Sequence, residues 1–188
     1  MWKKGFILTM VMVILAACSI SGGNPIERFS YTDQNGQTFG SEQLDGKVWV
    51  ANFIFTSCTT VCPPMTYNMT LLQDQLEEEG VEDVEFVSFS VDPEVDTPEV
   101  LTEFISDYNA NFENWHFLTG YSQETIESFA RDEFGALVKK PARGEVIHGT
   151  SLYVMDTKGG VIKDFPLVDG NGENVPFDEI VKTIKKAN

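Results

Sequence analysis

The chain has 188 residues, a length typical of one domain, and 42% of them are hydrophobic, including 14 phenylalanines, so it can fill a sizeable core. Its formal net charge of −16 argues against a nucleic-acid-binding surface. An acidic surface of this kind suits solubility or a basic partner, without identifying one.

The first residues have the features of a targeting segment. Lys3 and Lys4 precede an apolar run at residues 5–15, which is too short to cross a membrane comfortably. Small residues then lead to Cys18, and this order resembles a bacterial lipoprotein signal, in which the cysteine takes the lipid. We therefore expect a signal peptide at residues 1–17 and an extracytoplasmic chain anchored to the cell membrane through lipidated Cys18. The alternative is an ordinary secretory signal with an incidental cysteine.

After Cys18, the Ser- and Gly-rich composition predicts a flexible tether up to residue 26, followed by a single domain at residues 27–188. Residues 29–39 are expected to form a β-hairpin with Asn35-Gly36 at its turn. Residues 48–55 are almost continuously apolar, which indicates a strand covered on both faces.

Two cysteines, Cys58 and Cys62, follow this strand and precede two prolines. Because a residue before proline is pushed out of the helical region, Cys62 and Pro63 are expected to be extended, with a helix that starts near Pro64. Both thiols would then lie in front of a helix N-terminus, where partial positive charge favours the thiolate, the form that attacks disulfides and binds metals. A structural disulfide is the simpler alternative in an oxidising compartment.

The remaining pattern alternates between strands and helices. The helix after the prolines buries a stripe of Met65, Met69, Leu72 and Leu76, and a second central strand covers residues 85–91. A helix capped by Asp96 or Thr97 follows, then a strand at 115–118 and a helix from Ser122 to Gly135. The chain ends with a strand running from 146 through 155, an antiparallel strand at 161–165 and a closing helix. This order predicts an α/β, thioredoxin-like fold with a central mixed sheet flanked by helices and an N-terminal hairpin extension.

One of the two histidines is a further candidate metal ligand. His148, at the start of a strand after a loop containing Pro141 and Gly144, is a candidate third ligand beside two soft thiolates, whereas His116 is expected to be structural. Two thiolates and an imidazole suit copper or zinc, and a structural zinc site would need a fourth ligand, so copper is favoured. Met65 is a candidate soft ligand, with core filling as the more ordinary role.

Four motifs together resemble the Sco (SenC) family over residues 27–188: Phe55-Thr-Ser-Cys58-Thr-Thr-Val-Cys62-Pro63, Ser90-Val-Asp92-Pro93-Glu-Val-Asp96-Thr97, Leu118-Thr119-Gly120 and the late His148. The resemblance implies a thioredoxin fold, copper bound by Cys58, Cys62 and His148, and a role in assembling the dinuclear copper (CuA) centre of cytochrome c oxidase subunit II. It also places Asp92 near the site, although a turn before Pro93 explains that residue equally well. Where many members of the family have proline after the first cysteine, this chain has Thr59.

Two other activities use the same residues. In a thiol–disulfide reductase, Cys58 and Cys62 would reduce the target's cysteines through a mixed disulfide, with His148 at most a helper. In a peroxidase, Thr59 three residues before Cys62 would match the Thr-x-x-Cys of peroxiredoxins, although the second cysteine and the histidine fit the Sco family better.

Overall fold

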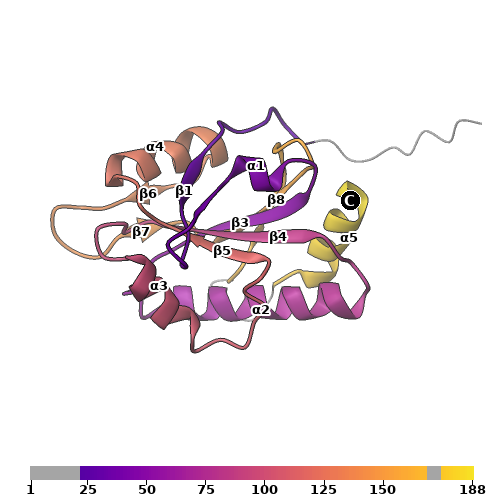
Figure 1. Ribbon diagram of the computed structural model, residues 1–188, viewed down its shortest axis with the longest axis horizontal. Coiled ribbons are helices and arrows are strands. Elements are labelled where there is room, and N and C mark those ends of the chain that lie inside the picture. The colour runs from indigo at the N-terminus through magenta and orange to yellow at the C-terminus, as the bar shows by residue number, and fades with distance from the viewer. Residues whose placement is uncertain (1–21, 169–174) are drawn as a thin grey trace, which may run out of the picture.

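The computed structural model describes residues 22–168 and 175–188 (Figure 1). The expected signal peptide and Cys18 lie outside these ranges. Within them, no helix is long and apolar enough to span a bilayer. In chain order the elements are β1 (Ser30–Thr32), β2 (Thr38–Gly40), α1 (Ser41–Leu44), β3 (Val48–Ile54), α2 (Cys62–Glu78), β4 (Val84–Ser90), α3 (Pro98–Ile105), β5 (Trp115–Leu118), α4 (Gln123–Phe134), β6 (Val138–Lys139), β7 (Ile147–His148), β8 (Ser151–Met155), β9 (Val161–Pro166) and α5 (Phe177–Ala187).

A mixed five-stranded sheet of order β5-β4-β3-β8-β9 forms the centre of the molecule. Strands β3, β4 and β5 are parallel, and β8 and β9 add antiparallel to the other side of β3. Helices α2, α3 and α5 cover one face, while α4 and the β1–β2 hairpin cover the other (Figure 1). The thioredoxin-like α/β fold and the N-terminal hairpin are therefore confirmed.

The core explains why β3 is apolar along its whole length. All seven of its residues are buried, because helices pack against both faces of the sheet. On one face Phe53 contacts Phe89 and Phe134, with ring centroids 5.4–5.6 Å apart. On the other, the predicted stripe of α2 is buried, with no member more than 2% exposed: Met65, Met69, Leu72 and Leu76.

Short-range signals place most of the helix ends. Gly36 adopts a positive φ at the turn of the β1–β2 hairpin, as the Asn-Gly pair predicts. The Ser122 hydroxyl caps α4, and Gly135 ends it in the left-handed region. Of the two residues considered for the cap of α3, the structure selects Thr97.

Three boundaries differ from the prediction. Helix α2 begins at Cys62 rather than near Pro64. The N–H groups of a first helical turn have no acceptor within the helix, so prolines at these positions remove no helical hydrogen bond. The strand expected from 146 through 155 is interrupted: β7 pairs only with β6, and β8 starts at Ser151 in the main sheet. From Gly22 onward the expected tether is packed, since the backbone N–H of Ile26 donates to Gly159 and Pro25 forms a bridge with Gly160.

Candidate metal and thiol site

The loop that carries the cysteines leaves β3 at its carboxyl end and is held there by Asp96. The Asp96 carboxylate accepts hydrogen bonds from the backbone N–H of Thr56 (3.3 Å) and from the hydroxyls of Thr56 and Ser90 (2.5 Å each). Burial raises the pKa of this carboxyl, and these hydrogen bonds only partly oppose that effect. From the sequence, Asp96 was a candidate helix cap and part of a motif, and nothing in the local pattern predicts its contact with Thr56, 40 residues away.

Cys58 lies in front of α2, close to the first N–H groups of the helix. The backbone N–H of Cys62 donates to the Cys58 sulfur over 3.3 Å, and the hydroxyl of Thr60 lies 3.7 Å from the same sulfur. Burial alone would raise the pKa of the Cys58 thiol, but hydrogen bonds from Cys62 and Thr60 outweigh it, so this pKa lies below its ordinary value. The expectation of a favoured thiolate at the helix start thus applies to Cys58.

Cys62 has the opposite character, although it is only four residues away. Its side chain is fully buried. Burial is the main reason that its pKa is raised, and the neighbouring Cys58 sulfur raises it further. The two sulfurs are not joined in a disulfide in this structure. The pair therefore combines one reactive sulfur with one that keeps its proton at neutral pH.

His148 reaches the sulfurs from the β6–β7 hairpin, 86 residues after Cys62. Its Nδ1 lies 2.7 Å from the carbonyl oxygen of Gly149, and since a carbonyl can only accept, Nδ1 carries the proton. The lone pair is left on Nε2, which lies 3.3 Å from the Cys62 sulfur. Burial lowers the pKa of His148, so the ring is neutral at pH 7, as a metal ligand must be.

One donor atom each from Cys58, Cys62 and His148 lies within 4.8 Å of the other two. The structure therefore brings the three residues together, with both cysteines buried and the histidine half-buried. Two soft sulfurs and one imidazole nitrogen form a donor set suited to copper(I) or zinc, and no carboxylate belongs to the group. The fixed tautomer of His148 directs its free nitrogen toward the sulfurs.

Asp92 lies apart from this donor group. Its backbone carbonyl accepts from the N–H groups of Val95 and Asp96, which forms the turn considered for it from the sequence. Its carboxylate pairs with the Nζ of Lys140 over 2.7 Å, and Lys140 also pairs with Glu94 over 2.7 Å. Because Lys140 directly follows β6, these ion pairs connect the turn to the hairpin that carries His148. No local pattern in the sequence predicts this link between residues 48 positions apart.

The other residues singled out from the sequence have different surroundings. Met65 is fully buried in the core, in agreement with the ordinary role considered for it. His116 stacks on Phe39 with ring centroids 3.7 Å apart, in the contact expected of a structural residue. Thr59 is exposed, and the hydroxyl beside a cysteine sulfur is that of Thr60 instead.

The family model described as SCO1/SenC matches residues 20–185 of the chain. A crystal structure described as a SCO1/SenC family lipoprotein from Bacillus anthracis is 46% identical, with a TM-score of 0.82 over 90% of this chain and 97% of that one. A structure of BsSco, whose description reports a disulfide switch and calls it a member of the Sco family of cytochrome c oxidase assembly proteins, is 44% identical, with a TM-score of 0.78 over 93% and 96% of the two chains.

A more distant relative has been solved with its metal. The structure of Arabidopsis thaliana ScoI with copper bound is 28% identical to this chain. Its TM-score is 0.69, and the match covers 88% of this chain and 98% of that one. The similarity therefore extends along nearly the whole length of each protein.

Proposed function

Because this chain belongs to the SCO1/SenC family, we propose that it carries copper bound by Cys58, Cys62 and His148. The observation that supports this most directly is the convergence of the three donor atoms within 4.8 Å from two separate parts of the chain. Copper accepts three-coordinate sites rich in sulfur, whereas structural zinc takes four protein ligands. The copper-bound structure of the Arabidopsis relative supports the same choice of metal.

Each residue has a distinct role in loading this cargo. The Cys58 thiol, whose pKa is lowered, would bind the copper ion first as a thiolate. Cys62 loses its proton when the metal arrives, and His148 contributes Nε2 without any change of protonation. Asp96 fixes the loop before Cys58, and we assign to Asp92 a supporting role outside the ligand set, through Lys140.

The recipient in this proposal is the CuA centre of cytochrome c oxidase subunit II. The description of BsSco as an oxidase assembly protein supports the partner, and the Bacillus anthracis lipoprotein supports an anchor at the membrane. In this proposal residues 1–17 are a signal peptide, Cys18 carries the lipid, and the copper-binding domain acts on the extracytoplasmic side.

The decisive test is a copper(I) titration of the reduced protein, followed by its sulfur-to-copper charge-transfer absorption under anaerobic conditions. Cys58→Ser and Cys62→Ser should abolish the absorption. His148→Ala should fold but bind copper at least about tenfold more weakly, which corresponds to roughly 1.4 kcal/mol. His116→Gln is the matched control, since it removes the other histidine. Equal affinity in His148→Ala and the wild type would remove His148 from the site.

A thiol–disulfide reductase is the second candidate function, favoured by the unequal acidity of the two cysteines. The Cys58 thiolate would attack a target disulfide and form a mixed disulfide, releasing one target thiol. Cys62 would then attack Cys58 and pass its proton to the second target sulfur, which leaves as a thiol, so this reaction does not need His148. Two electrons pass to the target, and the Cys58–Cys62 disulfide remains.

Oxidase maturation in a His148→Ala strain separates the two functions. Both need the cysteines, so cysteine variants cannot distinguish them, but only copper transfer needs the imidazole as a ligand. Maturation that requires added copper in this strain would support the carrier. Normal maturation without added copper would favour the reductase.

A further inference from the structure

The first described residues form part of the domain rather than a free tether. The backbone N–H of Gly22 donates to the Asp156 carboxylate over 2.7 Å, and that of Gly23 donates to the carbonyl of Val161 over 3.0 Å. The same carboxylate accepts from the N–H groups of Lys158 and Gly160 in the β8–β9 turn. One buried acid therefore binds the turn and the incoming chain together.

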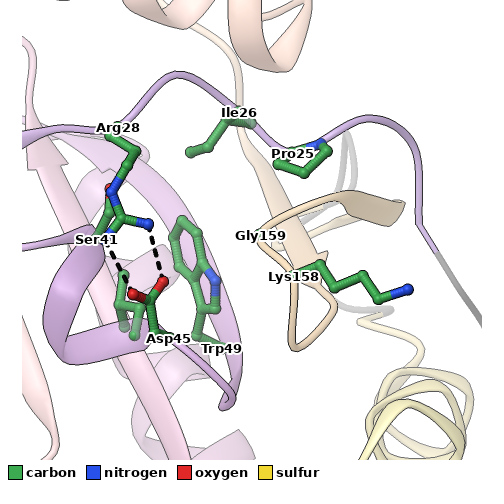
Figure 2. Close-up of a pocket in the computed structure, with 9 residues that line it drawn as sticks. Pro25, Ile26, Arg28, Ser41, Asp45, Trp49, Lys158 and Gly159 are labelled. Atoms are coloured by element: carbon green, nitrogen blue, oxygen red, sulfur yellow. Dashed lines mark hydrogen bonds and ion pairs between the residues drawn. The ribbon is translucent and has the colours of Figure 1, made fainter.

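Two glycines make this close approach feasible. A Cβ on Gly22 would lie 2.5 Å from the carbonyl oxygen of Gly160, and one on Gly160 would lie 2.5 Å from that of Gly23. Figure 2 shows the next residues, Pro25 and Ile26, lying over the turn at Gly159, where they border a cavity of only about 60 Å³. The contact is thus tight, and the segment follows a defined path.

This contact lies at the end of the sheet opposite to the cysteines. The turn before β3 meets the β8–β9 turn, because the N–H of Gly46 donates to Thr157 and Trp49 pairs with Met155. Cys58 follows the other end of β3. A strand of seven residues rises roughly 20 Å from its first to its last residue. In Figure 1, β6 and β7 lie at the left of the molecule, and the first described residues enter at the right.

We propose that the docked segment of residues 22–26 orients the domain on the bilayer, with the β8–β9 turn facing the lipid headgroups and the cysteines facing away. This inference rests on the proposed lipid anchor at Cys18. Only Ser19, Ile20 and Ser21 separate that cysteine from Gly22, so the two Cα atoms lie at most about 14 Å apart. The turn is thereby kept near the membrane surface, and the cysteines stand roughly one sheet length farther out.

The test places the acylated full chain in phosphatidylcholine nanodiscs that contain a small fraction of lipid with a gadolinium chelate on its headgroup. Amide NMR relaxation caused by the gadolinium should be at least about threefold faster at Lys158 and Gly159 than at Thr59 and Thr60, given their separation of roughly 20 Å. Equal relaxation at the two ends would overturn the proposal.

A matched pair of variants tests whether docking is the cause. Gly22→Ala brings a Cβ against Gly160 and should undock the segment, so the difference between the two ends should shrink. Gly23→Ala is the control, since its Cβ meets nothing closer than 3.9 Å, and it should keep the wild-type difference. A difference unchanged in Gly22→Ala would show that docking does not set the orientation.

Mass spectrometry of the membrane-extracted chain decides on the anchor itself. A chain without acyl groups on Cys18 would overturn this orientation together with the proposed anchor. The copper titration does not depend on acylation, so failure of the orientation and failure of the copper site remain distinguishable.

Discussion

Replacing Asp96 by alanine should destabilise the protein and loosen the loop that carries the first cysteine. Three donors lose their acceptor: the N–H and the hydroxyl of Thr56 and the hydroxyl of Ser90. Each buried donor left unpaired costs about 1–3 kcal/mol, but Thr56 is partly exposed and water can replace part of its loss. Removal of a buried carboxylate offsets some of the remainder, so we expect a net loss of about 2–3 kcal/mol in the free energy of unfolding.

Urea denaturation of Asp96→Ala and Asp96→Asn measures this loss. The amide of asparagine keeps one acceptor for Thr56 and can donate to the Ser90 hydroxyl, so Asp96→Asn should cost less than about 1 kcal/mol. The pKa of Asp96 is raised in the folded state, so its stabilising contribution is full below the ordinary value of 3.8 and declines as the pH rises through the folded pKa. The difference between the wild type and Asp96→Ala should therefore shrink from acid toward neutral pH. Equal losses in the two variants would refute the role of the hydrogen bonds.

Three further predictions concern the cysteines and the hairpin. Iodoacetamide should modify Cys58 at lower pH than Cys62, because only the Cys58 pKa is lowered; mass mapping that finds equal rates would contradict this. Lys140→Met should speed amide hydrogen exchange around His148 and copper release to a chelator, whereas Lys139→Met, which removes only an exposed ion pair with Glu127, should change both less. Copper affinity should rise with pH above 6.5, because the thiols must lose protons to bind the metal. The pKa of His148 is already below 6.5, so His148→Ala should show the same dependence of affinity on pH. A weaker pH dependence in the variant would show that the histidine titrates in this range.

Much of the fold could be predicted from short-range signals. The Asn35-Gly36 turn, the Ser122 cap and the Gly135 stop act within a few residues, so their effect is readable in the sequence. The docking of Gly22 depends on Asp156, 134 positions later, and no local pattern contains that information. The break after His148 has a similar origin, because β6 supplies a competing partner for β7.

The candidate site was predictable in its ligands but not in its supports. Two cysteines between a buried strand and a helix indicate a thiol site from the sequence alone, two soft sulfurs made His148 a candidate third ligand, and the resemblance to the Sco family implied the same residue. Asp92 and Asp96 occur in one short motif, so nothing in the sequence distinguishes the residue that fixes the cysteine loop from the one that pairs with Lys140. That distinction depends on which carboxylate is directed inward, and tertiary packing decides it.

The short β6–β7 hairpin makes the imidazole of His148 the donor that can move most easily, whereas the two cysteine sulfurs are held more rigidly. Both sulfurs are fixed by the central sheet and by the first turn of α2, whereas the imidazole is carried on a two-residue strand outside that sheet. Opening such a short hairpin breaks few backbone hydrogen bonds. Under the proposed copper-carrier function, the histidine nitrogen would therefore dissociate from the ion before the two sulfurs, and the acceptor protein would gain access to the metal on that side.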